Sequence, residues 1–201
     1  MPAIGSGPGQ CAGGSARLDL GGVVKLEVEG AAVGALIDNG GAIRADGGTV
    51  LLTAEGVGAL TSMAINNSGI IEANALSEGP GGSIRLLGGS GATVNSGTLS
   101  ATSVQADGGR IEVTGATVEL QAGAALDASG ATGGGTVLVG GDFQGNNALV
   151  ANAQSTTVQA GATIKADATQ AGAGGKVIVW ADQQTAFHGS ISARGAGPAA
   201  A

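Results

Sequence analysis

Short runs of alternating apolar and polar residues recur along this chain in groups, and a pair of glycines opens each group. In residues 174–195, Val177 and Val179 lie two apart in the first run, a second run covers 185–187, and a third surrounds Ile191. A period of two is typical of a β-strand with one buried face. This stretch therefore predicts three short strands joined by corners, which together make one coil.

The same unit recurs from the beginning of the chain to its end. The glycine pairs stand at 21–22, 47–48, 81–82, 108–109, 134–135 and 174–175, in steps of 26, 34, 27, 26 and 40 residues. A second pattern of glycine, then Ile or Leu, any residue and Ala, stands at 41–45, 69–73, 97–101 and 189–193, and with one extra residue at 123–128 and 161–166. Because loops of any length can leave a corner without disturbing stacked strands, this spacing predicts an all-β parallel β-helix of about six three-stranded coils.

A solenoid has no internal domain boundary, so we expect one β-helix over residues 17–195. Residues 1–16 and 196–201 are predicted to be disordered at its two ends. The alternation from 17 to 29 predicts a single half-buried strand. The longer steps predict insertions near 56–64, where the spacing permits a short helix, and near 140–156.

Composition narrows the function. Glycine supplies 41 of 201 residues and aromatic residues 1%, which would suggest disorder if Val, Ile and Leu were not periodic. A net charge of −7 argues against a nucleic-acid partner, because phosphate contacts need a basic surface. The single Cys11 makes no internal disulfide, and no spaced Cys or His cluster predicts a metal or other cofactor. No window predicts a membrane span, and the first residues do not read as a signal peptide.

Four stretches, residues 37–56, 65–89, 133–147 and 172–195, resemble consecutive segments of filamentous haemagglutinin-like exoproteins. These are large adhesins of Gram-negative bacteria exported by two-partner secretion. The resemblance implies a right-handed parallel β-helix in a secreted or surface-displayed fibre, with an outer-membrane transporter as partner of the parent protein's secretion domain. Short asparagine and proline motifs typical of that domain are not found here, so the chain resembles the end of the secretion domain and the start of the shaft that follows it.

Two sets of polar residues precede turn glycines or glycine pairs. Asn39, Asn67 and Asn95 stand two residues before turn glycines and predict a structural ladder at one corner, since asparagine suits turn geometry. Asp46 and Asp107 each precede a glycine pair and suggest the carboxylates of a polysaccharide-active enzyme. Because no nucleophile, base and orienting group accompany them, we expect no enzyme activity.

The 140–156 insertion is the largest departure from the repeat and the best candidate for a binding loop. With Trp180, which the alternation points outward, its Phe143 and Asp142 form the predicted ligand-binding residues, and sugars on a host or other surface are the predicted ligand. The alternative is a flap that covers apolar surface, with Phe143 tucked inward. His188 has no acidic or cysteine partner nearby in sequence and is expected in a solvated turn.

Three functions remain open: a structural adhesin shaft, a glycan-binding segment, and, least favoured, a polysaccharide-active enzyme. Uncapped coils would leave unpaired strand edges at both ends, which predicts self-association measurable by sedimentation.

Overall fold

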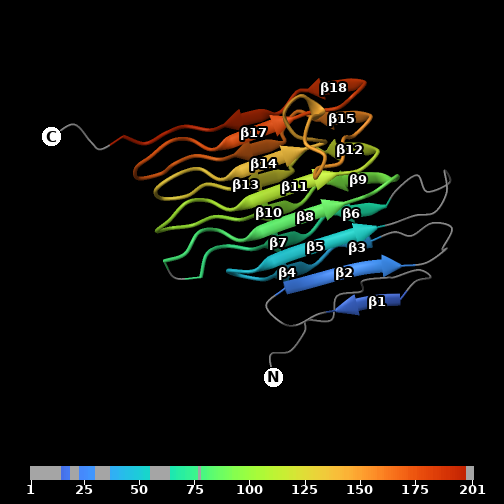
Figure 1. Cartoon of the computed structure of the whole chain (residues 1–201), viewed down its shortest axis with the longest axis horizontal. Coiled ribbons are helices and arrows are strands. Elements are labelled where there is room, and N and C mark those ends of the chain that lie inside the picture. Colours follow the sequence, from blue (N-terminus) through green and yellow to red (C-terminus); the bar gives the residue numbers. More distant parts are fainter. Residues whose placement is uncertain (1–14, 19–22, 30–36, 55–63, 77, 198–201) are drawn as a thin grey trace.

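The computed structural model describes residues 15–18, 23–29, 37–54, 64–76 and 78–197, and it shows three β-sheets that run along one solenoid (Figure 1). Sheet A has the order β1 (Ser15–Leu18), β2 (Val23–Glu29), β5 (Thr49–Ala54), β8 (Ser83–Leu87), β11 (Arg110–Thr114), β14 (Thr136–Val139) and β17 (Lys176–Val179). Sheet B has the order β3 (Ile37–Asn39), β6 (Ile65–Asn67), β9 (Ala92–Asn95), β12 (Thr117–Leu120), β15 (Ser155–Val158) and β18 (Gln184–Phe187). Sheet C has the order β4 (Ala42–Arg44), β7 (Ile70–Glu72), β10 (Thr98–Ser100), β13 (Ala125–Asp127), β16 (Thr163–Lys165) and β19 (Ser190–Ser192).

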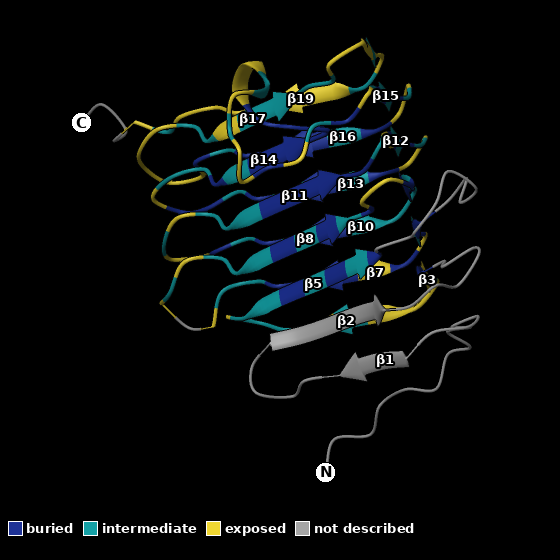
Figure 2. Cartoon of the chain, turned by 45° about the vertical axis from the view of Figure 1, so that its right-hand side comes forward, coloured by how far each residue is buried: buried dark blue, intermediate teal, exposed yellow. Residues whose placement is uncertain are grey.

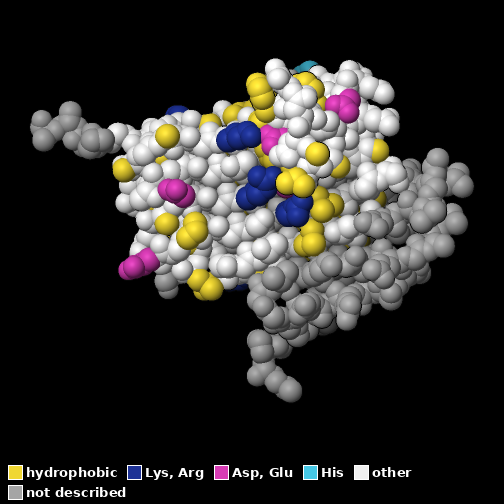
Figure 3. All heavy atoms as spheres, viewed as in Figure 1, with side chains coloured by type: hydrophobic (Ala, Val, Ile, Leu, Met, Phe, Trp, Pro, Cys, Tyr) yellow, Lys and Arg dark blue, Asp and Glu magenta, His cyan; other side chains and the backbone are white. Residues whose placement is uncertain are grey.

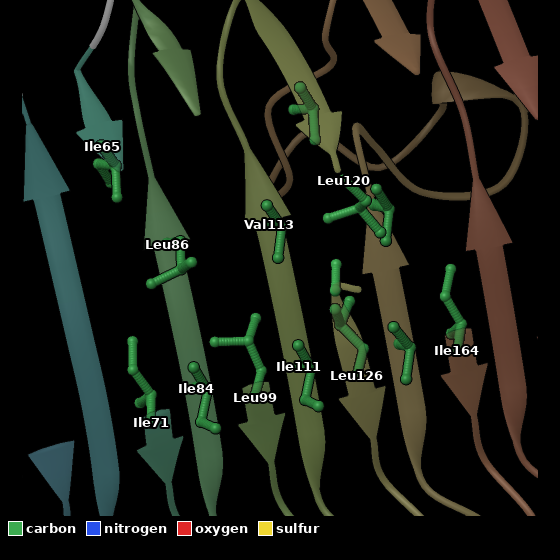
Figure 4. Packing of buried hydrophobic residues seen from close by; sticks show 14 of the residues in the cluster. Ile65, Ile71, Ile84, Leu86, Leu99, Ile111, Val113, Leu120, Leu126 and Ile164 are labelled. Atoms are coloured by element: carbon green, nitrogen blue, oxygen red, sulfur yellow. The ribbon is translucent and has the colours of Figure 1, made fainter. Parts of the chain in front are cut away.

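Each coil from β2 onward gives one strand to each sheet, and every strand lies parallel to its equivalents in the neighbouring coils. The predicted parallel β-helix of about six three-stranded coils is confirmed. Alternate residues of the strands point into a continuous core, in which Leu52, Ile84, Leu86, Ile111 and Val113 are fully buried (Figures 2 and 4). Val177 and Val179 pack against this core from the last coil, as the alternation predicts.

The glycine pairs form a narrow neck between the end of sheet C and the start of sheet A. At the five glycine pairs from 47–48 onward, the N–H of the second glycine donates to the carbonyl of the alanine that ends the Ile/Leu-x-Ala pattern, as from Gly82 to Ala73 and from Gly109 to Ala101, both at 2.7 Å. A Cβ at Gly82 would overlap the carbonyl oxygen of Gly48 in the coil below. The neck therefore requires glycine because two backbones meet there with no room between them.

Where a coil carries one extra residue before its third strand, a glycine in the left-handed region takes up the difference. Gly123 has φ of 90° and Gly161 has φ of 88°, and each lies in a tight turn closed by a backbone hydrogen bond, from Ala124 to Gln121 and from Ala162 to Gln159. The extra residue is absorbed outside the strands, so the register of sheet C is unchanged.

The predicted asparagine ladder is confirmed. Asn39 Nδ2 donates to Asn67 Oδ1 at 2.6 Å, and Asn67 Nδ2 donates to Asn95 Oδ1 at 2.6 Å. The amides of Asn67 and Asn95 also donate to the carbonyls of Gly69 and Gly97. Asn67 and Asn95 are buried, so these hydrogen bonds remove the cost of placing amides inside the coil.

The prediction of one strand from 17 to 29 is wrong. This segment contains β1 and β2, which pair antiparallel, with Leu18 opposite Leu26 and Ser15 opposite Glu29. Both halves alternate, so the pattern alone does not mark where the chain turns back, although the glycine pair at 21–22 lies between them. The edge of β2 is therefore covered, whereas β3 and β4 remain the end strands of sheets B and C at the N-terminal side, and β17, β18 and β19 are the last strands of their sheets at the C-terminal end. Self-association through these edges stays a prediction.

The last coil, formed by β17, β18 and β19, is more exposed than the coils just before it (Figure 2). Ile191, on the inward position of β19, is 46% exposed, whereas its equivalent Ile164 in the coil beneath is fully buried. Most of the predicted disordered ends, 1–16 and 196–201, and of the predicted insertion near 56–64 lies outside the described residues, whereas Ser15 and Ala16 belong to β1.

The neck yields a test of its own. We expect Gly82→Ala to lower the free energy of unfolding by about 2–3 kcal/mol, because the added methyl group forces the stacked backbones apart. Urea denaturation measures the loss. Gly41→Ala is the matched control, since a Cβ there meets nothing within 4 Å and its φ is not positive, and its stability should stay close to that of the wild type. Equal stability of the two variants would show that the backbone contact at Gly82 does not require glycine.

Candidate functional site

The predicted 140–156 insertion consists of the loop from β14 to β15, which contains the 3-10 turn η1 (Phe143–Gly145), and of the first two residues of β15; we keep the name 140–156 loop for it. Within the described part of the chain, Gln144 is the one non-glycine residue with a positive φ, at 56°. Such a backbone conformation persists where surrounding contacts hold it, and it often marks a functional loop. The contacts that hold this loop are made by Asp142 and Trp180.

Asp142 fastens the start of the loop to the sheet. Its carboxylate accepts hydrogen bonds from Asn147 Nδ2 at 2.8 Å, from Lys176 Nζ of β17 at 2.7 Å, and from the Phe143 N–H at 2.7 Å. These hydrogen bonds, together with the positive charge of Lys176, hold the pKa of Asp142 well below its ordinary value. The residue is buried, so the carboxylate serves the loop rather than an incoming ligand.

Trp180 supports the loop from beneath. Its indole Nε1 donates to Asp182 Oδ1 at 3.1 Å, and its carbonyl accepts a hydrogen bond from Thr156 Oγ1 at 2.7 Å. A Cβ at Gly141 would lie 2.8 Å from the ring atom Cδ1, and one at Gly145 would lie 3.1 Å from Nε1. Because the loop backbone approaches the ring this closely, the Cδ1–Nε1 edge of the indole is occupied by the protein itself.

Phe143 points away from this contact. It is 65% exposed, and Leu149 on the same loop is 87% exposed, whereas Val150 and Ala153 of this loop are buried, at 5% and 0%. The alternative in which Phe143 tucks inward is therefore wrong, because its ring is largely exposed and Ala153 is the loop residue that joins the core. The structure thus gathers the three predicted ligand-binding residues at one loop but gives them different environments: Asp142 and Trp180 hold the loop, and Phe143 stands free at its surface.

A second cluster, which the sequence reading missed, lies on the outward face of sheet A. Glu112 of β11 is only 1% exposed and accepts hydrogen bonds from Arg85 Nη2 at 3.1 Å and from Arg110 Nη2 at 2.9 Å. Basic side chains gather near the middle of this face (Figure 3). Arg85 stands directly opposite Glu112 in the β8–β11 register. Aligning the repeats on their glycine pairs would have revealed this pairing.

The carboxylates proposed for an enzyme do not assemble into a site. Asp46 and Asp107 lie two coils apart, with Pro80 at the equivalent place in the coil between them. Asp107 Oδ1 accepts a hydrogen bond from Thr132, and Asp46 faces Arg44 at 3.9 Å. Among the residues that the structure describes, no three His, Cys, Asp or Glu side chains come together as metal ligands would, and His188 is exposed.

The comparison with solved structures gives a clear neighbour. It is the crystal structure of the HMW1 secretion domain from Haemophilus influenzae, with a TM-score of 0.65 and 29% sequence identity over 81% of this chain. This chain resembles a secretion domain. The match covers 41% of that structure, so the chain spans less than half of its length. The similarity supports the relation to two-partner secretion adhesins that the sequence indicates, and the neighbour is a secretion domain rather than an enzyme or a shaft.

Two other comparisons gave nothing: no family model matches the chain, and no curated protein matches it in sequence. In the described part of the chain, no helix has the length and apolar character needed to cross a membrane.

The Asp142 contacts predict a pH-dependent seating of the loop. The folded pKa is depressed, so the carboxylate stabilises the seated loop above its unfolded pKa of about 3.9, and this contribution falls as the pH drops below that value. Trp180 is the only tryptophan, so its emission reports on the loop directly. We expect Asp142→Asn to shift the emission to longer wavelength at pH 7 and to remove the change that the wild type shows as the pH falls from about 4 towards the depressed folded pKa.

Asp107→Asn is the matched control for this titration, because its carboxylate bonds only to Thr132 among the described contacts. It should keep the wild-type emission and the wild-type pH dependence. An unchanged emission spectrum in Asp142→Asn would show that Asp142 does not hold the loop on Trp180.

Proposed function

We propose that this chain is part of a secreted or surface-displayed bacterial adhesin of the two-partner secretion kind. In it the chain serves as a rigid, non-enzymatic β-helical segment near the start of the shaft. The observation that carries the relation to these adhesins is the match to a secretion domain at 29% identity over 81% of the chain, which combines a shared fold with shared sequence. The place near the start of the shaft rests on the sequence resemblance alone.

The physical properties of the solenoid suit this role. Parallel ladders tie each coil to its neighbours, and the core is continuous from Ile37 to Ala166. A coil of this size cannot offset its own conformational entropy, so the coils stabilise one another and behave as one body. At about 4.8 Å per layer, six coils make a spacer that can project a binding site away from a cell surface.

The partner in this proposal is an outer-membrane transporter, engaged through the secretion domain of the parent protein. Sequencing several kilobases on both sides of the reading frame is the first test. We expect an in-frame secretion domain upstream, further glycine-pair coils downstream, and a neighbouring transporter gene.

A second experiment tests whether the parent protein depends on the transporter for export. Deleting the transporter gene should abolish the surface signal of the parent protein, measured as protease accessibility on intact cells, while its total amount in the cell stays measurable. A reading frame with no transporter gene nearby, or a surface signal that survives the deletion, would contradict the proposal.

A second candidate function is glycan binding by the 140–156 loop, and the exposed ring of Phe143 favours it. Aromatic rings stack on sugar faces, and a loop fixed by Asp142 and Trp180 would present the ring without further ordering. Phe143→Ala should then weaken binding on a glycan array by about tenfold, whereas Leu149→Ala on the same loop should change it little. Trp180→Ala should also weaken binding, by releasing the loop. Equal binding by wild type and all three variants would end this candidate.

A further inference from the structure

A trough crosses the starts of β5, β8 and β11 on the outward side of sheet A. Its volume is about 670 Å³, and its lining consists of three glycine pairs together with Thr49, Ser83 and Arg110. The glycine pairs are 47–48, 81–82 and 108–109. Because equivalent residues of successive coils stack, the trough runs along the solenoid axis and spans about 10 Å from β5 to β11.

The trough follows directly from the neck. Glycine is required there so that two backbones can meet, and the same absence of side chains leaves the outer surface hollow. The backbone of the trough floor has no free N–H groups for pairing with an added peptide strand at these positions. The N–H groups of Gly82 and Gly109 donate across the neck, and those of Ser83 and Arg110 donate to the coils below. An extended peptide would find these donors already used.

The side chains on its wall are hydroxyls and one guanidinium. Thr49 and Ser83 stand opposite each other in the β5–β8 register, and Arg110 stands opposite Ser83 in the next coil. Asp46 and Asp107 directly precede glycines of the trough but are not part of its lining. The trough therefore offers hydroxyl groups that both donate and accept, beside a fixed cation.

The guanidinium of Arg110 is positioned by a buried carboxylate. Glu112 accepts from Arg110 Nε at 3.3 Å and Nη2 at 2.9 Å, and it also holds Arg85. Two guanidinium groups share one carboxylate, so one positive charge of this cluster is left without a partner in it. The Arg110 side chain is 39% exposed, which leaves it able to meet an anionic group in the trough.

We propose that the trough binds a linear acidic glycan. A carboxylate or sulfate of the ligand pairs with Arg110, and ring hydroxyls bond to Thr49 and Ser83. A hydroxyl-rich chain fits a wall of this chemistry, and an extended polymer fits a trough that runs across three coils. Nucleic acid fits less well, because its phosphate backbone needs several basic side chains and Arg110 is the one basic residue of the lining. This site is separate from the 140–156 loop and independent of the function proposed above.

A matched pair of probes tests both parts of the proposal: a hexamer of β-1,4-linked mannuronate and the neutral β-1,4-linked mannohexaose, which differ only at the acidic group. Calorimetric titration of the whole chain should detect the acidic hexamer, with an affinity at least about tenfold above that of the neutral one and falling as salt rises. Equal affinity for the two probes, or no binding of the acidic one, would overturn the proposal.

Two variants test whether the acidic hexamer binds in the trough. Arg110→Gln should weaken binding of the acidic hexamer about tenfold, and Thr49→Phe, which fills the trough without touching the ion cluster, should abolish it. Arg44→Gln is the control, because Arg44 lies on sheet C, is 68% exposed and has the same charge. Thermal unfolding verifies that each variant is folded. If Arg110→Gln is destabilised, Thr49→Phe alone still tests whether the hexamer binds in the trough. Binding that survives in folded Thr49→Phe, or that falls equally in Arg44→Gln, would show that the ligand lies elsewhere.

Discussion

The whole solenoid depends on a hydrogen bond between a glycine N–H and an alanine carbonyl across the neck of each coil. This bond brings the end of sheet C to the start of sheet A, as between Gly135 and Ala128 or Gly175 and Ala166, each at 2.7 Å. Once the neck is closed, the coil can expand only outward, so loops of different length leave between the two residues and return to the same place. The strands that follow then enter sheet A in register, and the core side chains of successive coils stack on one another.

The sequence predicts this architecture well because the constraint is local and repeated. Glycine pairs, the Ile/Leu-x-Ala pattern and the period of two each mark a position in the coil, and together they set the strand order of all three sheets. The asparagine ladder was also predictable, since its members share a place relative to turn glycines. The antiparallel β1 was not, because its alternation is the same as that of β2 and no repeat to its N-terminal side fixes its direction.

The candidate sites were only partly accessible from sequence, since a side chain's use depends on what lies over it. Trp180 occurs where the alternation points outward, and the sequence predicted it as a ligand contact, but the backbone at Gly141 and Gly145 lies against the Cδ1–Nε1 edge of its ring. Glu112 also occupies an outward position and yet is buried, because two arginines from neighbouring positions close over it. Such coverage results from long-range packing, which a hydrophobic pattern does not encode.

One column of residues at the corner of sheet B changes character part-way along the solenoid. It reads Asn39, Asn67, Asn95, Leu120, Val158 and Phe187 from one coil to the next. If the coils slipped by one layer, a buried asparagine amide would face leucine and lose its partner, at a cost of about 1–3 kcal/mol. Coils with the same glycine pattern thus differ at this column, so the column specifies which coils stack as neighbours.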